Sequence, residues 1–342
     1  MERVRATARH SRFGSICDLP GYIIIDILAR LPLKAILNCR YVCKSWRNTI
    51  SDTYFAKVYL SKHGLPAMLM LRPGAQNNFY LVEPVGAYSF YGGHNDDACA
   101  PNIVVLKFNP SFDTSYLEKD LFVLAGSGFG FSPKTNQFKV LRFSLPRRLS
   151  SFKLETEINT LGTNLWRKVD NPPDYLQWLS RGCFLNGGLH WIVHDSNNRF
   201  KSLCVFDFGD EQFRPVPSPS HFVANHEGTV DQMNMALLGG CLAIYQYSSD
   251  YQLDIWLMKD YGGKESWTKE FVIETPTKSF LYQPLALLDN GEIFLLLNLN
   301  SLVSYSKVCQ IFSSVEIDGC RRDLKAKPFT PSFVSIRDVL KG

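Results

Sequence analysis

The fold of the N-terminal region is decided by residues 17–51, which read CDLPGYIIIDILARLPLKAILNCRYVCKSWRNTIS. Apolar residues recur in its first half at the three- and four-residue spacing of a helix: Leu19, Ile23, Ile24, Ile27, Leu28 and Leu31. This period predicts an amphipathic helix. Asp18 is a favourable N-cap, and Pro20 is tolerated in the first turn, where its missing N–H breaks no helical hydrogen bond. Pro32 ends the helix, because the residue before a proline is pushed out of the helical region.

Two further short helices are predicted after Pro32. Leu33, Ile36 and Leu37 suit a single turn. A third helix is expected to carry the following residues on one face: Cys39, Val42, Cys43, Trp46 and Ile50. Three helices of this length cannot bury all of this apolar surface among themselves. The segment is therefore either a helical hairpin that packs onto the rest of the chain or a surface that docks into a groove of another protein.

Four pieces of this segment resemble the F-box motif in order and spacing, namely Leu19-Pro20, Ile27-Leu28, Leu31-Pro32 and residues 40–47. The resemblance implies that the segment binds the small Skp-type adaptor of a cullin–RING ubiquitin ligase. Gly21-Tyr22 departs from the family, which usually has acidic or polar residues there. Gly21 costs the helix roughly 1 kcal/mol relative to alanine.

The adaptor contacts that we expect from this resemblance are apolar. They are Leu19, Pro20, Ile24, Ile27, Leu28, Leu31, Pro32 and Val42. Trp46 is expected chiefly to hold the three helices together, with part of its ring reaching the adaptor. Arginines and lysines also gather in residues 3–12 and 30–47, and they would favour an acidic partner through the association rate more than through affinity.

The composition is that of a globular chain long enough for two or more domains, with 342 residues, of which 45% are hydrophobic. The net charge of +5 does not argue for nucleic-acid binding. The nine cysteines are odd in number and irregularly spaced, which makes a poor disulfide framework and indicates a reducing compartment, the cytoplasm and/or the nucleus. No secretory leader is recognised, and no segment is predicted to cross a membrane.

The pattern of apolar residues along the chain changes near residue 65. Beyond it, short apolar runs bounded by glycine, proline and asparagine predict strands, for example at 68–72, 79–83, 103–108, 121–125 and 138–144. We therefore predict a basic tail at residues 1–14, a helical domain at 15–64 and an all-β domain at 65–342.

An internal repeat runs through the β domain. Two apolar strands joined by a glycine turn occur at 185–192, 238–244 and 288–295, about fifty residues apart. Trp166, Phe213 and Trp267 follow polar turns at the same spacing. A period of forty to fifty residues with four strands per unit is typical of a β-propeller, here of about five or six blades. A β-sandwich with long connections is the alternative.

Segments of this region resemble the F-box-associated interaction domain of plant F-box proteins, a kelch-like relative: 128–142, 160–167, 184–191 and 254–270. The resemblance implies a plant protein whose β domain captures a target. The chain would then be the substrate-recognition subunit of a Skp–cullin–F-box ubiquitin ligase, acting by proximity without bond chemistry of its own. Two alternatives stay open: a β-propeller enzyme or carbohydrate-binding module, and an F-box scaffold without ligase activity.

The sequence nominates no catalytic residue, cofactor or metal. The glycine run 126–130 is explained by a strand-to-strand turn, because no helix follows to face a phosphate. His190 and His194 would stand roughly 13 Å apart on a strand, too far for one metal ion. Asp96-Asp97 offers too few oxygens for calcium.

Large aromatic residues and long loops are the remaining candidates for target recognition. We expect most of the four tryptophans of the β domain to pack in the core: Trp166, Trp191, Trp256 and Trp267. The loops best suited to recognition are 86–100, 145–150, 171–179 and 218–231.

Overall fold

The structure is a computed structural model, and it describes most of the helical segment and the strands of the β domain. The described residues are 19–31, 33–52, 54–56, 58–59, 68–73, 79–85, 102–108, 122–132, 134–146, 154–163, 165–173, 175–176, 182–219, 222, 233–249, 251–276, 281–288, 290–298, 300–315 and 324–329. They form two compact units, one of helices and one of strands. The predicted boundary near residue 65 lies outside the described residues.

The helical unit contains α1 (Gly21–Leu28), α2 (Leu33–Cys39) and α3 (Lys44–Ser51). The prediction that Pro20 lies in the first turn of α1 is wrong, because Pro20 is its N-cap, with φ −53° and ψ 141°. Its carbonyl accepts hydrogen bonds from the N–H groups of Ile23 (2.9 Å) and Ile24 (3.3 Å). A proline disfavours helical geometry in the residue before it, which explains this later start. Asp18, the expected cap, lies outside the described residues.

The third helix also begins later than predicted. Cys43 is extended (φ −156°, ψ 167°) and caps α3, with its Sγ accepting a hydrogen bond from the Trp46 N–H at 3.4 Å. Cys39 therefore ends α2, and Val42 lies in the turn between the helices, not on the face of α3. The helices pack around a set of fully buried side chains: Leu28, Ile36, Ile50, Phe55 and Tyr59.

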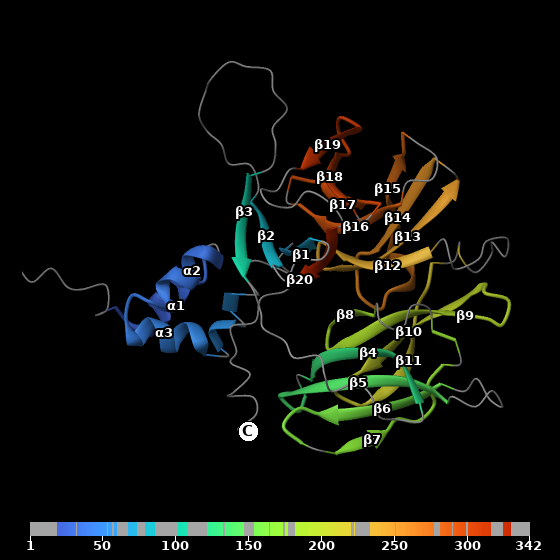
Figure 1. Ribbon diagram of the computed structural model, residues 1–342, viewed down its shortest axis with the longest axis horizontal. Helices are drawn as coiled ribbons and strands as arrows, with labels where there is room; N and C mark the ends of the chain where they lie inside the picture. Colours follow the sequence, from blue (N-terminus) through green and yellow to red (C-terminus); the bar gives the residue numbers. More distant parts are fainter. Residues whose placement is uncertain are drawn as a thin grey trace, which may run out of the picture. The chain divides into compact units, whose positions relative to one another are not determined.

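The other unit consists, in its described part, of five antiparallel four-stranded sheets (Figure 1). One sheet holds β20 (Leu324–Phe329), β1 (Met68–Pro73), β2 (Phe79–Val85) and β3 (Asn102–Phe108). The next holds β4 (Phe122–Ser132), β5 (Gln137–Pro146), β6 (Glu155–Thr160) and β7 (Trp166–Lys168). A third holds β8 (Cys183–Leu185), β9 (Gly188–His194), β10 (Phe200–Asp207) and β11 (Gln212–Val216).

The last two sheets complete the unit. One holds β12 (Met233–Leu238), β13 (Cys241–Ser249), β14 (Gln252–Met258) and β15 (Trp267–Glu274), with the short 3-10 helix η4 (Lys264–Ser266) before β15. The other holds β16 (Tyr282–Leu287), β17 (Ile293–Leu297), β18 (Ser301–Ser306) and β19 (Ile311–Val315).

Successive sheets meet at, or next to, one end strand of each sheet. β20 lies against β16, β16 against β12, and β12 against β8, while β4 lies against β9, the neighbour of β8. The end strands β20, β16, β12, β8 and β4 are therefore innermost, and β3, β7, β11, β15 and β19 are outermost. Four-stranded sheets that follow one another in this way form the predicted β-propeller. The ends of the unit meet in one sheet, where Met68 pairs with Phe329 and Pro73 with Leu324.

The turns between first and second strands explain the internal repeat. Gly187 (φ 80°) and Gly240 (φ 76°) hold the left-handed geometry that tight two-residue hairpins need. The predicted spacing of Trp166, Phe213 and Trp267 is confirmed, because they lie in β7, β11 and β15. Phe312 of β19 is a fourth member that the sequence analysis did not identify.

The glycine run 126–130 lies inside β4, so the prediction of a turn there is wrong. A Cβ on Gly130 would lie 2.2 Å from the Phe208 ring, and one on Gly128 would lie 2.2 Å from Leu189. The glycines therefore let the inner strand of one sheet approach the side chains of the next sheet.

Candidate functional site

The residues predicted to bind an adaptor fall into exposed and buried groups. Leu19 and Pro20 are exposed, Ile27 is 38% exposed, and Val42 is 60% exposed. Leu31 is half-buried, and Pro32 lies outside the described residues. The exposed members therefore precede α1, lie on it, and lie in the turn before α3.

Two of the predicted contacts belong to the interior. Leu28 has no exposed surface and Ile24 has 6%. Trp46 is half-buried, and its indole Nε1 is buried with no hydrogen-bond partner among the described residues. Burial gives these side chains a packing role in the helical unit, and contact with an adaptor stays a prediction for them.

Three exposed tyrosines on the helical unit were not predicted, and one of them, Tyr54, is 61% exposed. Tyr22 of α1 is 73% exposed, and Tyr41 beside Val42 is 83% exposed. Tyrosine is frequent where proteins bind one another, because it offers a large apolar ring and a polar tip. The dipeptides Gly21-Tyr22 and Tyr41-Val42 are the signal in the sequence for Tyr22 and Tyr41. Gly21-Tyr22 stands out only as a departure from the motif.

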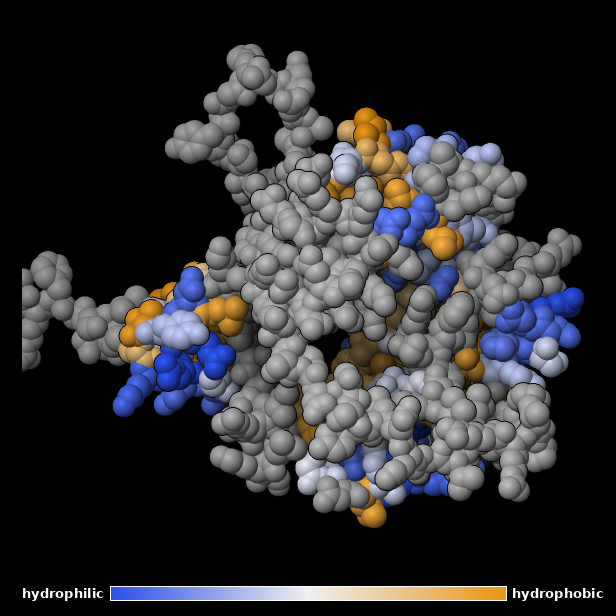
Figure 2. All heavy atoms as spheres, in the orientation of Figure 1, coloured by the Kyte–Doolittle hydropathy of each residue, from blue (hydrophilic) through white to orange (hydrophobic). Residues whose placement is uncertain are grey.

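Basic side chains share the surface of the helical unit with these apolar ones, and Figure 2 shows both kinds of residue on its exposed face. Arg30 pairs with Asp26 at 3.0 Å, and Arg47 donates a hydrogen bond to the Arg40 carbonyl at 3.3 Å. Lys44, the first residue of α3, is exposed. The surface is therefore amphipathic and basic.

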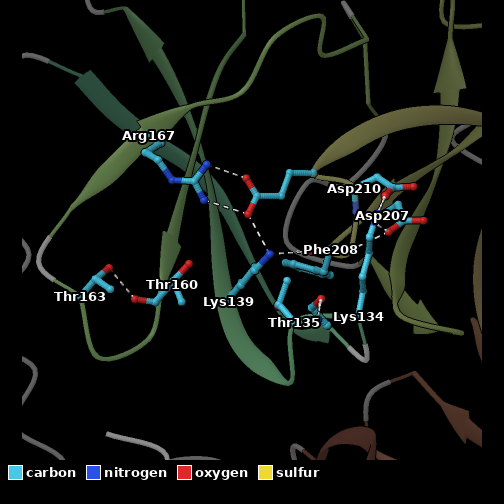
Figure 3. Close-up of polar contacts among 12 residues, drawn as sticks. Lys134, Thr135, Lys139, Thr160, Thr163, Arg167, Asp207, Phe208 and Asp210 are labelled. Carbon is cyan, nitrogen blue, oxygen red and sulfur yellow. Dashed lines mark hydrogen bonds and ion pairs between the residues drawn. The ribbon is translucent and has the colours of Figure 1, made fainter. Parts of the chain in front are cut away.

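A buried ion cluster joins two sheets of the propeller unit. Lys139 of β5 is 2% exposed and donates to the Phe208 carbonyl at 2.8 Å and to the Glu211 carboxylate at 2.7 Å. Arg167 of β7 binds the same carboxylate with two nitrogens, at 2.7 and 2.8 Å. Figure 3 shows Lys139 and Arg167 pointing toward this one carboxylate. The hydrogen bonds from Arg167 and then Lys139 hold the pKa of Glu211 below its usual value, against the effect of burial.

A second, exposed set of ions lies at the same turn. Lys134 donates to Asp210 at 2.6 Å, and Arg214 also donates to Asp210. These bonds lower the pKa of Asp210, and the bond to Asp210 raises that of Lys134. Such exposed pairs add little stability, whereas the buried cluster fixes how the two sheets meet.

The sequence holds one signal for this cluster, which was not predicted. Lys139, Leu141 and Phe143 alternate along β5 and are all buried, so a lysine stands in a row of core positions. A lysine in such a row needs a carboxylate nearby. Neither period nor spacing could indicate Glu211, which comes from the next sheet.

His190 and His194, the two histidines four positions apart, have different neighbours within the protein. His190 is buried, with Nδ1 3.0 Å from the Cys183 carbonyl and Nε2 2.7 Å from the Tyr261 hydroxyl. Burial lowers its pKa. His194 ends β9, and its ring lies beside that of Tyr175. In the described ranges no three histidine, cysteine or acidic side chains gather as metal ligands. Asp96-Asp97 lies outside those ranges.

The described cysteines are all free. Burial raises the pKa of Cys183 and of Cys204 to about 12, so these thiols stay protonated at neutral pH and are poor nucleophiles. Among the helices of the described part, none has the length and apolar character that a membrane crossing requires.

The tryptophans divide between core and cation-stacked positions. Trp191 and Trp267 are buried, as predicted. Trp166 and Trp256 are half-buried, and each has a cation over its ring: Arg142 at 4.2 Å and Lys269 at 5.1 Å. Trp256 also packs against the core, where its ring lies 5.6 Å from that of Phe222.

Most residues of the predicted recognition loops lie outside the described ranges, but the strands that they connect do not. Loops 145–150, 171–179 and 218–231 follow β5, β7 and β11. In an antiparallel four-stranded blade, the loop that joins the second strand to the third and the loop that leads to the next blade lie at the same end of the strands. Loop 86–100 joins β2 to β3, the third and fourth strands of its sheet, and therefore leaves from the opposite end.

Comparison with known proteins identifies the class of both units. Residues 16–57 match the F-box domain, and residues 113–336 match the F-box associated beta propeller domain. The second match covers more than half of the chain, so the protein belongs to the F-box associated beta propeller family. The match begins after β3, so the first three strands of the propeller unit precede it.

The relatives are F-box proteins of Arabidopsis thaliana, which confirms the resemblance to plant F-box proteins. "F-box protein At3g07870" is 28% identical, with 90% of this chain and 89% of the relative covered. "F-box protein CPR1" is 26% identical, over 93% and 89% of the two chains. "F-box/kelch-repeat protein At3g23880" is 25% identical, over 94% and 97%.

Proposed function

We propose that this protein is the substrate-receptor subunit of a Skp–cullin–F-box ubiquitin ligase. Its helical unit binds a Skp-type adaptor and, through it, the cullin–RING ligase. The propeller holds a target protein whose identity the sequence does not reveal. The role is non-catalytic and takes place in the cytoplasm and/or nucleus, where thiols stay reduced.

One observation carries the adaptor-binding part of the proposal. The helical unit, which matches the F-box domain, keeps Leu19, Ile27 and Val42 on its surface although an isolated small unit gains most by burying such side chains. Exposed aliphatic side chains on a unit that also exposes three tyrosines suit a protein partner.

The proposed mechanism is proximity. A receptor that holds its target near the ubiquitin-charged enzyme raises the effective concentration of the target's lysines. The ligase partner supplies the bond chemistry, so the receptor needs only two binding surfaces. The F-box match and the propeller match on one chain support this division of labour.

The first experiment is co-expression with a plant Skp-type adaptor, followed by size-exclusion chromatography. The wild type should elute as a one-to-one complex. Leu19→Ala/Pro20→Ala and, separately, Val42→Asp should lose the complex, because they remove exposed apolar contacts. Asn48→Ala is the control: Asn48 is an exposed polar residue of α3 and lies outside the predicted set. It should retain the adaptor.

Circular dichroism and limited proteolysis should show that the variants remain folded. Adaptor binding at wild-type affinity by both the double variant and Val42→Asp would contradict the assigned surface. A folded wild type that forms no complex would contradict the proposed function and reopen the enzyme, carbohydrate-binding and scaffold alternatives. A scaffold without ligase activity would bind the adaptor but leave target turnover unchanged.

A further inference from the structure

The outermost strand of each sheet has one edge without a neighbouring strand among the described residues. Such an edge presents unpaired N–H and C=O groups at alternate residues, and proteins commonly protect it with charged residues or proline. Three of the outermost strands whose side chains are described are protected in this way. The protecting residues are Arg167 and Lys168 in β7, Arg214 and Pro215 in β11, and Lys269 and Glu270 in β15.

Strand β19 is the exception, because its sequence Ile-Phe-Ser-Ser-Val contains neither a charge nor a proline. Ile311 is 60% exposed, and Ser314 is also exposed. Val308, in the turn just before the strand, is 90% exposed. An uncharged backbone edge therefore lies beside two exposed aliphatic side chains.

The other edge of β19 is held firmly. All five residues pair with β18, from Ser306 opposite Ile311 to Leu302 opposite Val315. The Phe312 ring lies 4.9 Å from that of Tyr305 and 5.3 Å from that of Tyr282. The free edge is therefore preformed, and a partner strand would not have to order it.

We propose that the free edge of β19 binds an extended, uncharged segment of the target protein, which adds to the sheet as a fifth strand. This inference rests on the proposed function, because it assigns the target-binding element of the receptor. Main-chain hydrogen bonds supply affinity in such complexes, and side-chain contacts supply selectivity. Ile311 and Val308 select apolar or β-branched side chains opposite them, and β19 itself carries no charge that would hold a charged segment.

The test uses the full chain in complex with its adaptor and a phage-displayed library of random peptides. Selected peptides, resynthesised with a fluorophore, should carry uncharged runs that alternate in apolar residues. Ser314→Lys, which copies the protection seen on β15, should weaken their binding at least about tenfold. Val272→Lys is the matched control, because Val272 is 51% exposed on the already protected strand β15. It should leave binding unchanged.

Methylation of alternate backbone nitrogens in the peptide should abolish binding, because it removes donors without changing side chains. Residue-resolved hydrogen exchange should show new protection in β19. A library that yields no binder, or peptides insensitive to Ser314→Lys, would overturn the proposal. Protection of every β19 amide from hydrogen exchange in the free monomer would also overturn the proposal. A dimer that pairs through β19 would overturn it as well. Ser314→Lys must still co-purify with the adaptor, so these outcomes do not depend on the F-box assignment.

Discussion

The ammonium group of Lys139 lies 2.7 Å from the carboxylate of Glu211, and this pair links the sheet of β4–β7 to the sheet of β8–β11. The Lys139 side chain is 3% exposed, so it loses almost all of its hydration. The Phe208 carbonyl and the Glu211 carboxylate replace that water. A buried charge with such partners is costly to leave unpaired.

Glu211→Ala should therefore destabilise the protein by about 1.5–3 kcal/mol, the usual worth of a hydrogen bond to a charged group, because Lys139 is buried while Glu211 is 21% exposed. Denaturant-induced unfolding of the full chain measures this change. Lys134→Ala is the control, because it breaks an exposed pair with Asp210 and should change stability little. Equal losses in the two variants would mean that the buried cluster does not hold the sheets together.

Stability should fall when the pH drops below neutrality, in part through His190. Burial lowers the pKa of this histidine below its ordinary value of 6.5 in the folded state. As the pH falls, the histidine of the unfolded chain binds a proton before that of the folded chain does. The contribution of His190 to the free energy of unfolding is therefore complete above pH 6.5 and is lost as the pH falls through the folded pKa. One proton gives a slope of at most about 1.4 kcal/mol per pH unit. Unfolding free energies between pH 8 and 5 should show a shallower slope for His190→Gln than for the wild type.

Gly130→Ala should destabilise the propeller unit by about 1–3 kcal/mol through overpacking, because the new Cβ would overlap the Phe208 ring. Gly240→Ala tests backbone strain instead: nothing lies within 4 Å of its Cβ, but its φ is +76°. That variant should lose about 1 kcal/mol. Thermal unfolding of the two variants shows which of them loses more stability. A smaller loss for Gly130→Ala than for Gly240→Ala would show that the two sheets move apart easily.

Lys44→Glu should slow association with an acidic adaptor several-fold and change dissociation little, because exposed charges act mainly on the encounter rate. Surface plasmon resonance with immobilised adaptor measures both rates. The difference from the wild type should shrink as salt is raised, because ions screen exposed charges. A salt-independent difference would point to a direct contact of Lys44 in the complex.

Much of the fold could be predicted from local pattern. The stripe from Leu19 to Leu31 predicted α1, and the turns at Gly187, Gly240 and Gly291 predicted the repeat, because tight turns demand left-handed residues. Helix starts were less accurate. The extended backbone of Pro20 and Cys43 decided them, and polarity patterns do not report backbone angles.

The site was predictable only in part, since a sequence motif names residues without separating contact from core. Ile24 and Val42 belong to one motif, yet the first is buried and the second is exposed. The Lys139–Glu211 pair was not predictable, because its members lie 72 positions apart and come from different sheets. The glycines at 128 and 130 were misread for the same reason, since the side chains that require them, Leu189 and Phe208, come from another sheet.

The pairing of β1 with β20 has a consequence for folding during translation. When β1 leaves the ribosome, the strand that completes its sheet, residues 324–329, has not yet been synthesised. The four later sheets each consist of strands contiguous in sequence and can form as translation proceeds. The first three strands can pair with one another, but the second edge of β1 stays without its partner strand until nearly the whole chain has been made.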